Sequence, residues 1–129
     1  MIIARAEMNK VNQKLAASEF KFYLTGSVFF RGKGKDIDYF VQDSQKVREF
    51  LINSGFQLLP PVEHNYMDFQ CSAVFRNTLG NPSVDVQCVT NAKLKSKIQN
   101  TFLKAGVFSP TTVMWNLAFQ LYDEIKKVD

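Results

Sequence analysis

Residues 24–41 read LTGSVFFRGKGKDIDYFV, so an apolar segment ending in Gly-Ser is followed by a basic stretch and then by two aspartates around an isoleucine. Short strands are predicted on either side of the basic stretch, over Lys21–Thr25, which ends at Gly26, and over Ile37–Gln42. The residues directly after Gly26 are predicted to open a short helix. The stretch therefore predicts two strands joined by a helical turn and a basic loop.

The rest of the chain predicts a single α+β domain over residues 1–129, in which helices pack against a mixed sheet. Its core is expected over residues 3–90 and its C-terminal helices over 92–127. Periodicity and turn residues predict an amphipathic helix over 3–19, a helix over 44–54 with Ser44 as N-cap, a strand over 56–59, a loop over 62–67, a hairpin of strands over 68–76 and 84–89, and a helix from about 92 that stops near Gly106.

The last predicted helix has the strongest periodic pattern in the chain. Ser109 is expected as its N-cap, with Pro110 in the first turn. Trp115 and Tyr122 are expected to pack, with stacking on a base as the alternative. The apolar stripe expected to face the core consists of Met114, Leu117, Ala118, Leu121 and Ile125.

Composition indicates a globular protein. Hydrophobic residues make up 46% of the chain and charged residues 22%, and 12 phenylalanines favour a well-filled core. No apolar run reaches the roughly 20 residues of a membrane span, and the N-terminus lacks the pattern of a signal peptide, so a cytoplasmic protein without a membrane partner is predicted. The formal charge of +4 is compatible with a polyphosphate or nucleic-acid partner. Cys71 and Cys88 lack the spacing of metal ligands and are interpreted as free thiols.

Asp36 and Asp38 are the first candidates for chemistry. Residues two apart on a strand project to the same face, so these two carboxylates point together while Ile37 points into the core. Such close carboxylates repel each other unless a cation lies between them, and Mg²⁺ prefers carboxylate and phosphate oxygens. The alternative is a solvated turn with two incidental acids.

The segment before these acids has the residue types of a phosphate site. Gly26 lets the backbone approach a phosphate closely, and Ser27 supplies a hydroxyl. Arg31, Lys33 and Lys35 lie between this turn and the acids, where they are expected to meet triphosphate charge. A solvated basic loop is the alternative for the three cations.

Asp85 is the third candidate acid. It lies between Val84 and Val86 in a predicted strand, and an aspartate is costly to bury unless it is paired or coordinated. A solvent-facing strand position is the alternative explanation.

Together these residues resemble the signature of the DNA polymerase beta-like nucleotidyltransferase superfamily, and of its minimal members in particular. The resemblance covers about residues 3–90, and the predicted order of elements agrees with that fold. Lys35 departs from the pattern, because small members usually carry serine before the first aspartate. The signature maps onto Leu24, Gly26 and Ser27, an eight-residue gap, Asp36-Ile37-Asp38-Tyr39 and Val84-Asp85-Val86, with Arg31-Gly32 as an additional match.

The resemblance implies an enzyme that moves a nucleoside monophosphate from a nucleoside triphosphate, with ATP as the expected donor, to a protein, an RNA end or a small molecule, and releases pyrophosphate. It implies that Asp36 and Asp38 bridge two Mg²⁺ or Mn²⁺ ions and that Asp85 completes the second. Ser27 and the Gly26 backbone would grip the terminal phosphates. Minimal members act with a helical partner, so a helical protein or a second copy of the chain is an expected partner.

Two other functions stay open at this point. One is a catalytically silent nucleotide-binding or regulatory module with the same fold, although the presence of all three acids argues against it. The other is an unrelated α+β interaction domain. The lysines of the helix from residue 92 are predicted as a solvated face, but they would favour a nucleic-acid acceptor if they lined the cleft. They are Lys93, Lys95, Lys97 and Lys104.

Overall fold

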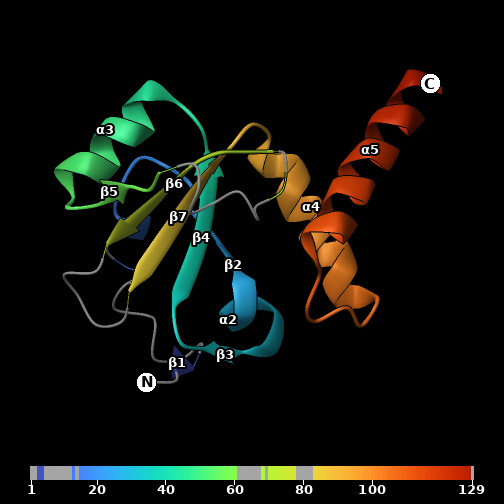
Figure 1. The fold of residues 1–129 in the computed structure, drawn as a ribbon, viewed down its shortest axis with the longest axis horizontal. Helices are drawn as coiled ribbons and strands as arrows, with labels where there is room; N and C mark the ends of the chain where they lie inside the picture. Colours follow the sequence, from blue (N-terminus) through green and yellow to red (C-terminus); the bar gives the residue numbers. More distant parts are fainter. Residues whose placement is uncertain are drawn as a thin grey trace.

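The computed structural model describes residues 3–4, 13, 15–60, 68, 70–77 and 83–128. Within them, a five-stranded mixed sheet has the order β2-β4-β7-β6-β5, and a second sheet pairs β1 with β3 (Figure 1). The strands are β1 (Ile3–Ala4), β2 (Tyr23–Thr25), β3 (Lys33–Gly34), β4 (Ile37–Gln42), β5 (Gln57–Leu58), β6 (Cys71–Asn77) and β7 (Val84–Val89). The helices are α2 (Gly26–Arg31), α3 (Gln45–Asn53), α4 (Ala92–Lys104) and α5 (Thr112–Val128). The predicted α+β class is confirmed.

The two central strands are the only parallel pair of the large sheet in the described part of the chain. β4 runs parallel to β7, whereas β2 with β4, β6 with β7 and β5 with β6 are antiparallel. Figure 1 shows α3 beside β5 and β6, and α4 with α5 at the opposite side of the molecule. The parallel pair matters for the site, because it brings two segments far apart in the sequence into direct register.

One face of the sheet holds the main apolar core. Ile37 and Tyr39 of β4 and Val86 of β7 are fully buried, in one cluster with Val47 and Leu51 of α3. Burying one such aliphatic side chain stabilises the fold by roughly 1.5–3 kcal/mol. Because side chains alternate along a strand, the residues between these apolar positions project to the other face.

The other face is partly covered by α4. Phe40 and Val89 pack there with Ala92, at the start of α4. A second cluster joins α4 to α5 through Leu94 and Phe119. The part of this face that α4 leaves uncovered carries the polar residues described below.

Several local predictions are confirmed, and the bounds of two strands agree to the residue. The strands over 37–42 and 84–89 have the predicted bounds, and the second pairs with β6 as a hairpin. Ser44 caps α3, accepting a hydrogen bond from the backbone N–H of Val47 at 3.1 Å. The helix from residue 92 ends at Lys104, close to the predicted stop.

Other boundaries differ from prediction. Ile3 and Ala4, predicted as the start of a helix, form β1 because they pair with Lys33 and Gly34. Gln13, Leu15 and Ala16 are helical, and the rest of the helix predicted over 3–19 lies outside the described residues, as does the loop predicted over 62–67. The strand predicted from residue 68 begins at Cys71.

The last helix corrects the sequence-based interpretation most clearly. It begins after Thr111, whose hydroxyl accepts a hydrogen bond from the N–H of Met114, so neither Ser109 nor Pro110 starts it. Two members of the predicted stripe face outward, since Leu117 is 55% and Leu121 59% exposed, whereas Met114 and Ala118 are half-buried. The side chain of Ile125 lies outside the described residues. The buried side carries Trp115, which packs edge-on against Phe102 and stacks with Phe119. Large aromatic rings bury more apolar area than leucines, and they determine which face turns inward. Among the described helices, none has the length and apolar content of a membrane span.

Candidate functional site

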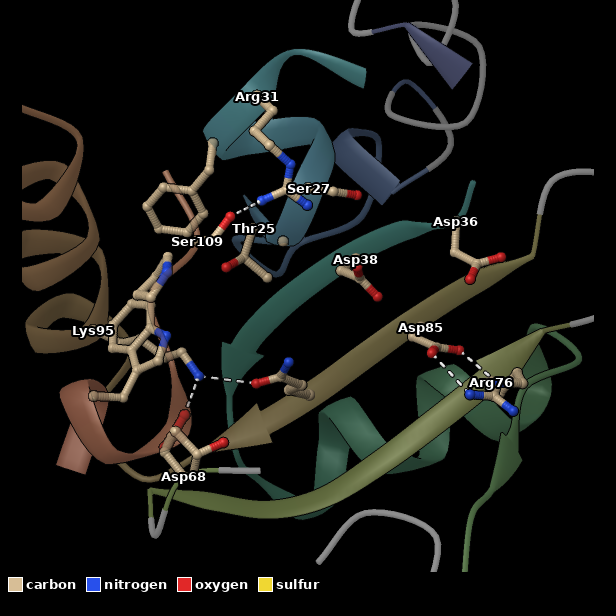
Figure 2. Close-up of a pocket in the computed structure, with 16 residues that line it drawn as sticks. Thr25, Ser27, Arg31, Asp36, Asp38, Asp68, Arg76, Asp85, Lys95 and Ser109 are labelled. Atoms are coloured by element: carbon tan, nitrogen blue, oxygen red, sulfur yellow. Dashed lines mark hydrogen bonds and ion pairs between the residues drawn. The ribbon is translucent and has the colours of Figure 1, made fainter. Parts of the chain in front are cut away.

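A pocket of about 520 Å³ opens on the sheet face that α4 leaves uncovered. Its walls come from the end of β2, the start of β4, β6 and β7, and from α2, α4, the start of α5 and the segment before it (Figure 2). The volume lies within the range of roughly 300–1,000 Å³ typical of small-molecule sites.

All three predicted acids line this pocket. Asp38 of β4 and Asp85 of β7 are direct register partners on the parallel strands, and Asp36 immediately precedes β4. Their neighbours Ile37 and Val84 turn to the buried face, so alternation places the carboxylates on the pocket face, as Figure 2 shows. The structure thus brings together side chains 47 positions apart, the difference between 38 and 85, through one strand pairing.

Gly26 and Ser27 also line the pocket, at the start of α2. Gly26 has a φ of 70°, and a Cβ built there would collide with the Asp38 carboxylate. A Cβ at Gly34 would collide with the Ser27 hydroxyl. Both glycines therefore make room for polar groups of the site, a role that the sequence interpretation had not given to Gly34.

The electrostatics of the acids depend on burial and on their closeness. Burial is the largest cause that raises the pKa of Asp38 from 3.8 to about 7. The negative charges of Asp85 and then Asp36 act in the same direction, and the positive charge of Arg76 opposes them. A divalent cation next to this carboxylate would favour its ionised form and reverse the shift.

The acids suit a divalent ion in part. Among the described residues, no group of three His, Cys, Asp or Glu side chains is arranged to enclose a metal. Mg²⁺, however, is commonly bound through one or two carboxylates, with waters and substrate phosphates completing its octahedron. Asp36 and Asp38 fit that donor set, whereas both carboxylate oxygens of Asp85 already accept hydrogen bonds from Arg76.

Asp85 forms an ion pair with Arg76 that sequence reasoning missed. Nε of Arg76 donates to Oδ1 of Asp85 at 2.8 Å and Nη2 donates to Oδ2 at 3.1 Å. The two residues face each other across the β6–β7 ladder. If Asn77 is paired with Val84 at the end of the predicted hairpin, Arg76 falls opposite Asp85. The ion pair could therefore have been predicted from the hairpin register, although no sequence motif indicates it.

The predicted cations occupy different places. Arg31 lines the pocket, but its Nη1 donates to the carbonyl of Phe108 and to Oγ of Ser109, both at 2.7 Å, and so ties α2 to the segment before α5. Lys33 and Lys35 are exposed and do not line the main pocket. They border an adjoining hollow of about 420 Å³ that shares four residues with it, Ser27, Arg31, Asp36 and Asp38.

Lys95 lies in a different place from the one that its sequence pattern predicts. It was predicted on a solvated face with Lys93, Lys97 and Lys104, which are indeed exposed, but it is only 2% exposed itself and lines the pocket. Its ammonium group donates to Oδ2 of Asp68 at 2.7 Å and to Oε1 of Gln87 at 2.9 Å. The amine also lies 4.9 Å from the ring centre of Trp115. The helical period alone puts residue 95 beside Leu94 on the inner face, and a buried acid makes that position tolerable for a lysine.

Comparison of the chain with protein-family models, with curated proteins and with solved structures finds no match. The geometry of the pocket is therefore what bears on function.

Proposed function

We propose that this chain is a metal-dependent nucleotidyltransferase, which transfers a nucleoside monophosphate from a nucleoside triphosphate to an acceptor hydroxyl. ATP is the expected donor, and a protein, an RNA end or a small molecule the expected acceptor. The observation that carries the proposal is the convergence of Asp36, Asp38 and Asp85 in one pocket beside Gly26 and Ser27.

The candidate residues of the pocket and of the adjoining hollow have distinct proposed roles. Asp36 and Asp38 hold Mg²⁺ or Mn²⁺, which supplies positive charge to the triphosphate and acidifies the acceptor hydroxyl. The Ser27 hydroxyl and the Gly26 backbone bind the terminal phosphates. Lys33 and Lys35, at the adjoining hollow, balance the remaining triphosphate charge.

The transfer itself is a substitution at phosphorus. The acceptor oxygen forms a bond to the α-phosphorus, the bond from that phosphorus to the bridging oxygen breaks, and pyrophosphate leaves with its electron pair. Asp85, on the same pocket face, is the proposed acceptor of the proton from the attacking hydroxyl or the additional ligand of a second ion. The surrounding side chains position the reactants and stabilise charge, which is the main contribution of a protein to this reaction.

Transfer of label tests the proposal. The purified chain is incubated with each α-³²P-labelled triphosphate, Mg²⁺ and cell extract, with Asp36→Asn and Asp38→Asn as controls. Metal-dependent labelling of one acceptor, reduced by orders of magnitude in both variants, is the expected result. If no acceptor is labelled by any of the four triphosphates, with Mg²⁺ or with Mn²⁺, the proposal is contradicted.

One observation favours a second candidate, a module of the same fold that binds nucleotide without turnover. A protein that binds no catalytic ion at Asp85 needs another positive charge to compensate this acid. Arg76 supplies that charge. A silent module would bind triphosphate and protect it, whereas an enzyme would release pyrophosphate. A coupled pyrophosphate assay run beside the labelling experiment separates the two candidates.

A further inference from the structure

The ion pair of Arg76 and Asp85 occupies both oxygens of the third acid. Its two hydrogen bonds, at 2.8 and 3.1 Å, form the parallel fork that a guanidinium makes with a carboxylate. The side chain of Asp85 is 13% exposed and that of Arg76 is 37% exposed, so the pair lies at the wall of the pocket and remains in contact with solvent.

Arg76 differs from the other cations that line the pocket. Of the described residues there, Arg31 donates to Phe108 and Ser109, and Lys95 donates to Asp68 and Gln87. Only the guanidinium of Arg76, among these pocket cations, forms an ion pair with one of the three acids of the site. It therefore compensates the charge of one of the three acids, Asp85.

A guanidinium and a divalent ion compete for the same carboxylate. Both need its oxygen lone pairs, and both are positive, so an ion at Asp85 would lie a few ångströms from the Arg76 charge. Charges that lie this close at a partly buried site interact strongly, because water screens them only in part. That repulsion is large enough to exclude a second ion unless new negative charge enters the pocket.

We propose that Arg76 is a positioning residue that neutralises Asp85 and limits the nucleotide-free pocket to a single divalent ion, held by Asp36 and Asp38. The second ion joins only with the triphosphate, whose own charge compensates for Arg76. This inference rests on the proposed function, and it makes loading of the second ion conditional on the substrate.

The chain contains a matched control for this role. Arg48 of α3 and Asp43, just before the helix, form another two-bond pair, with distances of 2.8 and 2.9 Å. Neither residue lines the pocket. Breaking the Arg48 pair therefore removes an equivalent interaction without changing the charge at the acids.

Mn²⁺ binding to the full chain without nucleotide tests the proposal, measured by electron paramagnetic resonance of the free ion. Wild type and Arg48→Gln should each bind one ion. Arg76→Gln should bind a second, at least about tenfold more tightly than wild type does, since removal of the charge relieves the repulsion. Arg76→Lys retains the charge and should bind one ion.

A double variant tests whether the single ion is held by Asp36 and Asp38, independently of Asp85. Arg76→Gln/Asp85→Asn removes both charges of the pair, should fold by circular dichroism, and should bind one ion. Two ions in wild type without nucleotide, or the same single ion in wild type and folded Arg76→Gln, would overturn the role of Arg76 and leave the proposed function standing. Absence of Mn²⁺ binding in every variant, with and without ATP, would overturn both.

Discussion

Two ion pairs line the same pocket and differ in how much water reaches them. The side chains of Lys95 and Asp68 are each 3% exposed, and the lysine is further surrounded by Gln87, Phe40 and Trp115. The Arg76–Asp85 pair is open to the pocket, with exposures of 37% and 13%. Figure 2 shows the two pairs on opposite sides of the view, with Asp38 between them.

The difference in access implies a difference in role. Removing one partner of a fully buried pair leaves a charge without water or counter-ion, so breaking the Lys95–Asp68 pair is costly. Through its bond to Gln87 of β7, Lys95 also holds α4 against the sheet. An ion pair at the pocket wall can exchange partners, because water and a ligand can replace the lost interactions. The acids near Arg76 are therefore the adaptable side of the site, and Lys95 belongs to its fixed wall.

Breaking the buried pair should have the largest effect. Lys95→Met leaves Asp68 buried and uncompensated, and should lower the free energy of unfolding by about 3–5 kcal/mol. Urea denaturation followed by circular dichroism measures the loss, and Lys95→Met/Asp68→Asn should recover most of it. A loss below about 1 kcal/mol would mean that the pair is not the fixed element described here.

Crowding at the acids should give the next effect. In Gly26→Ala the alanine must adopt a φ of 70°, and its Cβ collides with the Asp38 carboxylate. In Gly32→Ala the alanine must adopt a φ of 81°, but its Cβ has no neighbour within 4 Å. Gly32→Ala should cost about 1–2 kcal/mol from the backbone alone, and Gly26→Ala about 1–3 kcal/mol more from the collision. Equal losses in the two variants would show that Asp38 does not lie against Gly26.

Opening the exposed pair should cost less than breaking the buried one. Arg76→Gln should lower the free energy of unfolding by about 1–2 kcal/mol, since solvent reaches Asp85 once the guanidinium is gone. The same urea titration compares it directly with Lys95→Met. A loss as large as that of Lys95→Met would remove the distinction between the two pairs.

The smallest effect expected is a gain. The pKa of Asp38 is raised from 3.8 to about 7 in the folded state, so its contribution to stability is full below pH 4 and is lost as the pH rises toward 7. In metal-free buffer at pH 7.5, Asp38→Asn should therefore raise the melting temperature by roughly 3–10 °C, and it should flatten the decline of wild type between pH 4 and 7. A lower melting temperature for the variant would identify Asp38 as structural.

The sequence was sufficient where short-range periodicity determines the outcome. Alternation alone predicts that Asp36 and Asp38 share a face opposite Ile37, and the apolar neighbours of Asp85 predict the same for it. Pairing of β4 with β7 then brings the acids together. The resemblance to a known signature, which spans both segments, is what grouped Asp36, Asp38 and Asp85 as one candidate site.

Long-range packing explains the parts that the sequence did not predict. The burial of Lys95 depends on Asp68, which lies on another segment, and the partner of Asp85 depends on the register of a hairpin. Arg31, which is predicted to meet phosphate charge, also donates to the carbonyl of Phe108, 77 positions away, and no local pattern indicates that contact. In α5 two apolar faces compete, and only the surface presented by α4 determines that the one with Trp115 is buried.

Isothermal titration calorimetry of ATP into the purified chain tests the central claim most directly, because it requires no acceptor. With Mg²⁺ or Mn²⁺ present, ATP should bind to wild type, and binding should be lost in a chelator and in Asp38→Asn, since the acids repel the triphosphate without an ion between them. ATP binding of equal affinity with metal and with chelator, or unchanged binding in Asp38→Asn, would contradict a metal-dependent nucleotide site at these acids.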